Sequence, residues 1–156
     1  LSNIKKNVIL IPGASHFSKR YSIENFAELT NLLDVNYFII WGNREEKIIA
    51  EKIKNLSPKV NLCNRLTINS LISLFSQVDL VIGPDTGPTH IGWALNIPSI
   101  TLFGPTPGYR NTLTTDINKI IESKSKVNPF RINKNDYSIN DISVNEVVKI
   151  AMSLLD

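Results

Sequence analysis

Cysteine is almost absent from the sequence, which has Cys63 alone among its 156 residues. A single cysteine excludes an internal disulfide and a metal cage built from several cysteines, which favours a reducing compartment. The simplest role for Cys63 is that of a small apolar core side chain. Long apolar runs are also missing, since no segment approaches the roughly 18–20 residues that a membrane-spanning helix needs. We therefore expect a cytoplasmic protein.

An excess of one charge sign is missing too. The 17 Lys and Arg and the 14 Asp and Glu are interleaved, and the net charge is +3. This balance fits an anionic small ligand or an acidic surface and gives only weak support for nucleic acid, which we do not expect as a partner. Charged residues at 20% and hydrophobic residues at 42% exclude disorder and predict one globular domain. Pro12 and Gly13 interrupt the first apolar stretch too early for a signal peptide, and the chain starts at Leu1, so we expect a piece of a longer protein.

Two phosphate-binding motifs are absent as well. No G-x-G-x-x-G pattern follows the first apolar run, and no Walker A loop occurs anywhere. A hydride-transfer domain and a P-loop ATPase are thereby disfavoured.

The sequence does contain short apolar runs that alternate with helical patterns, which is typical of βαβ units around a parallel sheet. The expected strands are residues 8–11, 35–41, 60–62, 78–82, 99–103 and 119–122. The expected helices are residues 23–33, 45–55, 69–76, 88–95 and 144–155, the last opened by a capping box of Ser143 and Glu146. Residues 124–140 are polar and predict a loop. The pattern predicts an α/β fold, a Rossmann-like doubly wound parallel sheet of about six strands.

Polar residues gather where the expected strands end. The first strand is followed by PGASHFSKRYS, the second by GNREE, the fourth by GPDTGPTH and the fifth by GPTPGYR. In an open parallel sheet, ligands bind outside the carboxyl ends of the strands, where the strand order reverses. A doubly wound order makes the first and fourth strands neighbours. Lys19 and Asp85 would then face each other across the crevice.

The stretch GPDTGPTH predicts an anion site at the start of a helix. Gly87 permits close backbone approach, and Pro88 suits the first helical turn. The free N–H groups and the positive dipole end would then point into the crevice. Two alternatives remain open from the residues alone: Asp85 or Thr86 could simply cap the helix, and His90 could pack in the core.

Charged pairs in two other loops are further candidates. Lys19 and Arg20 would lie opposite the anion site, although such a pair can also be a solvated surface feature. Glu45 and Glu46 follow the second strand, where nucleotide-binding domains often carry an acid for the ribose hydroxyls. Acidic residues are equally favoured there by the helix dipole alone.

Three blocks together resemble a known family. The order PGAS with KR, then WGN with EE, then GPDTGPTHIGWALNIPSITLFGPT is similar to the C-terminal domain of the family 9 glycosyltransferases, the lipopolysaccharide heptosyltransferases. The similarity covers about two thirds of the chain. It implies one Rossmann-like half of a GT-B enzyme, the half that binds the nucleotide-sugar donor.

The resemblance also implies chemistry: inverting transfer of heptose from ADP-heptose, with no cofactor and no obligatory metal. Lys19 would neutralise the donor diphosphate, with Arg20 beside it, and Asp85 would hold sugar hydroxyls. The amides of Thr86 and Gly87 would receive phosphate. Glu45 or Glu46 would bind the ribose, and His90 would support the loop or touch the donor.

The same resemblance places the lipid A-core acceptor site and the general base in an N-terminal domain that this chain lacks. It implies peripheral association with the cytoplasmic face of the inner membrane. Trp93 departs from the small residues usual in the family.

Two other functions fit the same residues: another GT-B transferase or a sugar-nucleotide epimerase, and a non-catalytic nucleotide-binding module.

Overall fold

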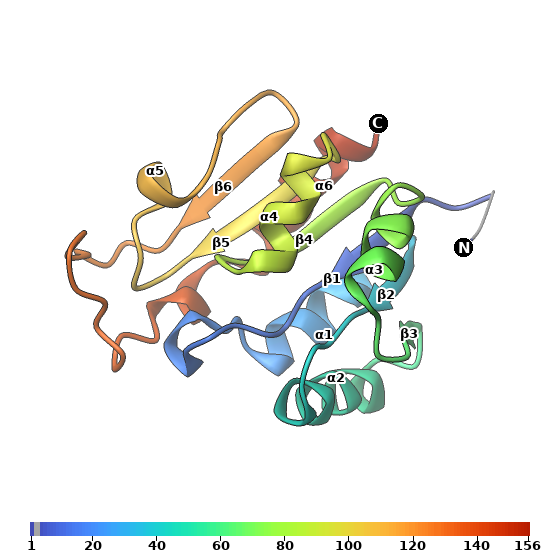
Figure 1. The fold of residues 1–156 in the computed structure, drawn as a ribbon, viewed down its shortest axis with the longest axis horizontal. Coiled ribbons are helices and arrows are strands. Elements are labelled where there is room, and N and C mark those ends of the chain that lie inside the picture. Colours follow the sequence, from blue (N-terminus) through green and yellow to red (C-terminus); the bar gives the residue numbers. More distant parts are fainter. Residues whose placement is uncertain (2–3) are drawn as a thin grey trace.

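The computed structural model describes residue 1 and residues 4–156, which form one six-stranded sheet (Figure 1). The strands run in the order β3-β2-β1-β4-β5-β6, and every neighbouring pair is parallel. Their bounds are β1 Asn7–Leu10, β2 Asn36–Ile39, β3 Val60–Leu62, β4 Leu80–Pro84, β5 Ser99–Phe103 and β6 Asn118–Glu122. This order confirms the predicted doubly wound fold. It also makes β1 and β4 neighbours at the point where the strand order reverses.

Helices cover both faces of the sheet (Figure 1). One core cluster joins the strands to α1 Ile23–Leu32, α2 Arg44–Leu56 and α6 Val144–Leu155. The cluster on the other face includes α3 Ile68–Phe75 and one side of α4 Gly87–Ala94. Because both faces are covered, every residue of β1, β4 and β5 is buried. No helix in the described part of the chain is both long and apolar enough to cross a membrane.

Some boundaries differ from the prediction. β4 starts at Leu80 and not at Val78, because the Val78 N–H donates to the carbonyl of Phe75 in the turn that ends α3. β2 ends at Ile39, which leaves Trp41 in the loop that follows. Three short elements were not predicted. They are the 3-10 helices η1 Phe17–Lys19 and η2 Ser138–Asp141, the latter beginning inside the expected loop 124–140, and the single turn α5 Gly108–Asn111.

Helix starts separate into capped and uncapped ones. The N-cap side chains of α1, α2 and α3 each accept a backbone N–H, and these residues are Ser22, Asn43 and Thr67. Ser143 is the N-cap of α6, but the predicted capping box is wrong, because the Glu146 N–H donates to the Ser143 carbonyl and not to its hydroxyl. Thr86, the N-cap of α4, likewise makes no side-chain cap. The first N–H groups of α4 are thus left for another partner.

Candidate functional site

A buried ion pair lies at the carboxyl edge of the sheet, where the loops after β1 and β4 meet. Lys19, at the end of η1, places Nζ 2.8 Å from Oδ2 of Asp85. The two side chains are only 12% and 5% exposed. The facing positions expected from the strand order are therefore confirmed, and the two residues are in direct contact.

The Asp85 carboxylate is surrounded by donors. Oδ2 also accepts hydrogen bonds from Thr106 Oγ1 at 3.1 Å and Asn111 Nδ2 at 2.9 Å, and Oδ1 lies 3.1 Å from His90 Nε2. A carboxylate offers about four acceptor positions. Asp85 makes four contacts, because the ion pair with Lys19 adds to these three. Asp85 does not cap α4. The interpretation of Asp85 as an N-cap is therefore wrong, because its oxygens contact the side chains of four residues and not the backbone at the start of α4.

The surroundings of Asp85 fix its charge. Burial alone would raise the pKa of Asp85, but hydrogen bonds from His90 and Lys19, the Lys19 charge and the Asn111 amide hold that pKa well below its usual range. Asp85 is thus ionised at neutral pH. The Lys19 and Asp85 charges balance each other inside the crevice.

His90 and the start of α4 complete this side of the crevice. The His90 side chain is 34% exposed, and its ring centroid lies 5.6 Å from that of Trp93. His90 therefore supports Asp85 and is not a core residue. A Cβ added at Gly87 would meet nothing within 4 Å, so the helix start opens onto free space. An uncapped helix start next to open space is a ready anion site.

Arg20 and Glu45, two of the predicted donor-binding residues, contact each other. Arg20 Nε and Nη2 both donate to the carbonyl of Ala14, at 3.1 and 3.0 Å, and Nη2 also pairs with Glu45 Oε2 at 3.2 Å. The Arg20 guanidinium stacks 4.2 Å from the centre of the Phe17 ring. Neither Arg20 nor Glu45 lines the pockets beside the ion pair. Their contacts hold the Lys19 loop in shape and tie it to α2.

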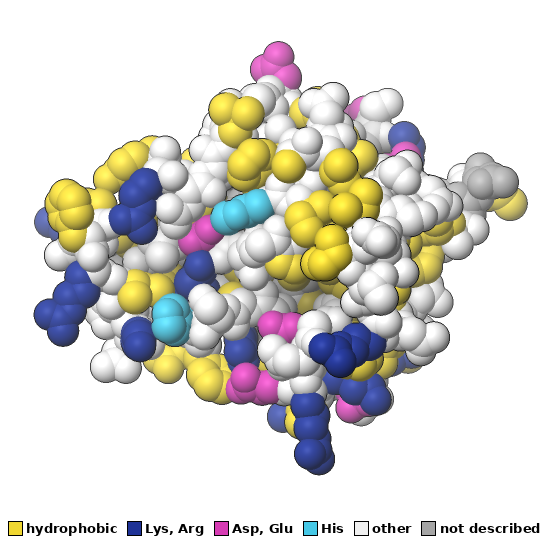
Figure 2. Space-filling view, viewed as in Figure 1, with side chains coloured by type: hydrophobic (Ala, Val, Ile, Leu, Met, Phe, Trp, Pro, Cys, Tyr) yellow, Lys and Arg dark blue, Asp and Glu magenta, His cyan; other side chains and the backbone are white. Residues whose placement is uncertain are grey.

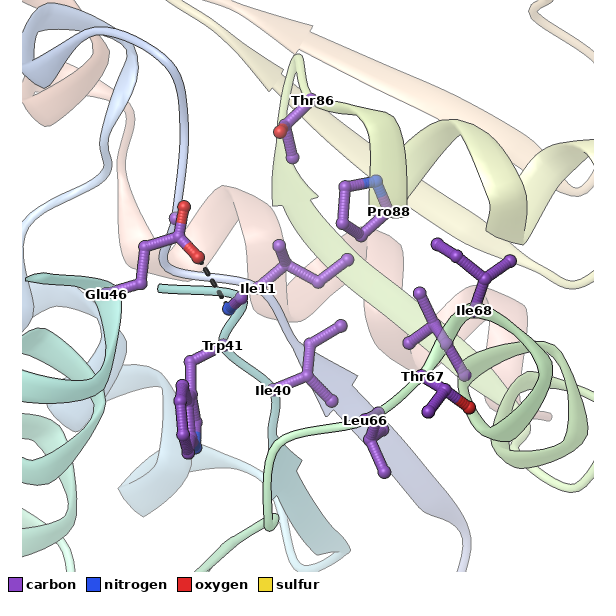
Figure 3. Close-up of a pocket in the computed structure, with 12 residues that line it drawn as sticks. Ile11, Ile40, Trp41, Glu46, Leu66, Thr67, Ile68, Thr86 and Pro88 are labelled. Carbon is purple, nitrogen blue, oxygen red and sulfur yellow. Dashed lines mark hydrogen bonds between the residues drawn. The ribbon is translucent and has the colours of Figure 1, made fainter. Parts of the chain in front are cut away.

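Glu46, the other candidate acid, faces the crevice. Its Oε2 accepts the Gly42 N–H at 2.7 Å, and a Cβ at Gly13 would lie only 2.5 Å from the Glu46 Cδ. Glu46 lines a pocket of about 180 Å³ on the β2 side of the β1–β4 junction. Figure 3 shows its carboxylate at one end of the pocket. Apolar side chains make most of the remaining wall, among them Ile11, Ile40, Leu66, Ile68, Leu71 and Pro88.

A second pocket, of about 320 Å³, lies on the other side of the same junction and is mostly polar. Figure 2 shows basic side chains around the part of this face where both histidines lie. The polar residues of its wall include Lys19, Asp85, Thr106, Arg110, Asn111 and Arg131. We had not singled out the last four from the sequence. Thr106 and Arg110 belong to the loop GPTPGYR after β5, which the sequence analysis assigned to the binding edge, and Asn111 is the next residue. The polar loop around Arg131 gave no signal.

Within the described residues, no group of three His, Cys, Asp or Glu side chains is placed to hold a metal ion.

Cys63 is half-buried against the core cluster of α3, and burial raises the pKa of its thiol. Cys63 packs mainly as an apolar side chain, as its sequence context predicted.

Comparison with known proteins gives consistent relatives. The model of glycosyltransferase family 9 (heptosyltransferase) matches residues 2–136. The lipopolysaccharide heptosyltransferase 1 of Campylobacter coli is 35% identical over 99% of this chain and 48% of its own length. The lipopolysaccharide core heptosyltransferase OpsX of Haemophilus influenzae is 33% identical over 71% of this chain and 33% of its own length. The chain thus spans about half of the first relative's length.

Solved structures share the fold. The Escherichia coli heptosyltransferase WaaC with ADP has a TM-score of 0.81 at 17% identity, covering 99% of this chain and 46% of that one. A family 9 glycosyltransferase from Veillonella parvula has a TM-score of 0.82 at 20% identity, covering 99% and 47%. These matches extend the likeness over nearly every element described above. By its family match and its relatives, the chain belongs to glycosyltransferase family 9, the heptosyltransferases.

Proposed function

We propose that this chain is the C-terminal, donor-binding domain of a lipopolysaccharide heptosyltransferase that uses ADP-heptose. The observation that carries the proposal is the order of features along the sheet edge. The apolar pocket with Glu46 comes first, then the open start of α4 at Gly87 and the Lys19–Asp85 pair, and then the polar pocket. A nucleobase, ribose, diphosphate and sugar follow one another in the same order.

The apolar pocket suits the nucleobase. Its wall offers aliphatic side chains from several segments, which favour a flat apolar ring over water. Glu46 at its end can accept ribose hydroxyls through Oε1, since the Gly42 N–H occupies Oε2. Of the two acids expected to bind ribose, Glu46 is the better placed, because Glu45 pairs with Arg20.

The diphosphate would lie at the start of α4. The N–H of Gly87 and the dipole of α4 favour negative charge there, and Thr86 has no side-chain cap that competes for it. Lys19 would turn from Asp85 toward the phosphates and stabilise the charge that grows on the departing ADP. This arrangement needs no metal. It leaves one acceptor position on Asp85 free for a hydroxyl of the transferred sugar, while His90 keeps the carboxylate in place.

The acceptor and the general base belong to the part of the enzyme outside this chain in this proposal. The acceptor would be the lipid A-core of lipopolysaccharide, reached at the cytoplasmic face of the inner membrane. The support for this is the family membership, together with the fact that the chain spans about half of the Campylobacter coli relative.

ADP binding to this chain and to its Gly87→Ala variant tests the donor site. A methyl group at Gly87 has free space in the absence of ligand, so the melting temperature should stay unchanged. It should obstruct a phosphate at the helix start and weaken ADP binding by at least about tenfold in calorimetry. A matched control, Gly92→Ala, adds its methyl group 3.2 Å from Val81 on the buried side of α4 and should change stability more than affinity.

Equal ADP affinity in the wild type and Gly87→Ala would remove the diphosphate from the start of α4. A panel of ADP-heptose and uridine or guanosine diphosphate sugars then tests the base and the sugar. A preference for another nucleotide sugar would point to a different transferase or an epimerase. The absence of binding to every member would favour a module without donor chemistry.

A further inference from the structure

The outer wall of the polar pocket carries two arginines that the donor site does not use. Arg110 lies in α5, and its Nε donates to Asn111 Oδ1 at 3.1 Å. Asn111 in turn donates to Asp85 at 2.9 Å, so Arg110 is connected to the centre of the site. Arg131 comes from the loop between β6 and η2. Both arginines thus reach one recess from separate segments.

The charges in this pocket do not balance. Asp85 is the one carboxylate among the described residues that line it, and Asp85 is already paired with Lys19. Within residues 1 and 4–156, no carboxylate forms an ion pair with Arg110 or Arg131. The two arginines line one pocket, are exposed to solvent and have no counter-charge among the described residues. Such groups bind a carboxylate or phosphate in a bidentate manner.

The position of the arginines separates them from the donor's own phosphates. The nucleobase pocket lies on the β2 side of the β1–β4 junction, and the start of α4 and Lys19 lie at the junction. Arg110 and Arg131 lie on the β5–β6 side, in the pocket that the buried Asp85 also lines. A donor laid out in this direction places its sugar at Asp85. The arginines then face the group that the sugar is transferred to.

We propose that Arg110 and Arg131 form an acceptor subsite, which binds a carboxylate or phosphate of the acceptor next to the hydroxyl that receives the sugar. This inference rests on the proposed function. It assigns part of the acceptor recognition to the donor-binding domain. The subsite would also account for the two unpaired positive charges of the pocket. They would bind an anionic acceptor and position it next to the donor sugar before the bond between sugar and phosphate breaks.

Steady-state kinetics of the full-length enzyme with Arg110→Gln and Arg131→Gln tests the subsite, using heptose-free lipopolysaccharide core as acceptor. Each variant should raise the acceptor KM about tenfold, the size expected for a lost charge-assisted hydrogen bond. The KM for ADP-heptose should stay within about twofold. Lys149→Gln, which removes one positive charge from the exposed side of α6, is the matched control and should change neither value.

The outcomes are distinct. A raised donor KM with an unchanged acceptor KM would overturn the proposal, because the arginines would then serve the donor phosphates. Unchanged kinetics in both variants would overturn it as well. Arg131→Gln guards against a folding artefact, since none of the described residues holds the Arg131 side chain by a hydrogen bond or ion pair. Failure of the wild type to bind ADP would instead defeat the proposed function.

The source of the anion is settled with the same enzyme and a phosphatase-treated acceptor. If the tenfold effect of Arg131→Gln disappears with the treated acceptor, the subsite binds a phosphate group. If the effect persists, the subsite binds a carboxylate. Both results support an anion subsite.

Discussion

Replacing Asp85 by Asn should destabilise the fold, although Asn is as good a helix cap as Asp. At 2.8 Å, the Lys19–Asp85 attraction is about 6 kcal/mol at an effective dielectric constant of about 20, most of it offset by desolvation. Removing one charge leaves Lys19 buried without a partner, which typically costs about 3–5 kcal/mol. The Asn amide can still accept from Lys19, so we expect about 3 kcal/mol.

A loss of this size lowers the melting temperature of a domain of this length by about 6–12 °C. Differential scanning calorimetry of the ligand-free chain measures it directly. A double-mutant cycle with Lys19→Met measures the interaction energy between Lys19 and Asp85. This coupling energy should exceed about 1 kcal/mol, because Lys19→Met removes the buried charge that Asp85→Asn leaves without a partner. A melting temperature of Asp85→Asn within about 2 °C of the wild type, or strictly additive effects, would refute the assignment of Asp85 to a buried ion pair.

Two further predictions concern the pH dependence of the Asp85 contribution and the contact between Gly13 and Glu46. Because the pKa of Asp85 is lowered in the folded state, its stabilisation is complete above the unfolded value of about 3.9 and is lost as the pH falls below it. Urea unfolding at pH 7, 5 and 3 should therefore show a stability gap between the wild type and Asp85→Asn that narrows toward pH 3, and a constant gap would contradict this. In Gly13→Ala, the new methyl group would meet the flexible Glu46 side chain at 2.5 Å and displace it, so ADP affinity should fall about tenfold while pyrophosphate affinity stays constant. Calorimetry measures the affinity for both ligands. If the double variant Gly13→Ala/Glu46→Ala binds ADP more weakly than either single variant, the effect of Gly13→Ala does not act through Glu46.

Much of the local structure could be predicted from the sequence, because strand runs and helix periods are local properties of the chain. The apolar runs were short and continuous, as strands covered on both faces require, and all six were found with boundaries within about two residues. The capping box at Ser143 and Glu146 failed for a local reason as well. A backbone carbonyl competed with the Ser143 hydroxyl for the same N–H, and residue types alone do not decide that competition.

Only the tertiary structure decided which of the charged candidate residues face the site. Lys19 and Arg20 are adjacent in the sequence, yet η1 directs Lys19 toward Asp85, while Arg20 turns back onto the carbonyl of Ala14. Glu45 and Glu46 separate in the same way, because successive residues at a helix start point in different directions. Neither pair could be resolved from its composition.

The sequence by itself therefore determined the fold class, the binding edge and the family, because the runs, the turn residues and the GPDTGPTH block are encoded within short segments. Only the tertiary structure decided which side chains meet in the site. Asn111 and Thr106 reach Asp85 from segments 26 and 21 residues away, and Arg131 joins the polar pocket from a loop with no motif. Contacts between distant segments depend on how the strands pair and on how loops fold over the edge, and no local pattern records them.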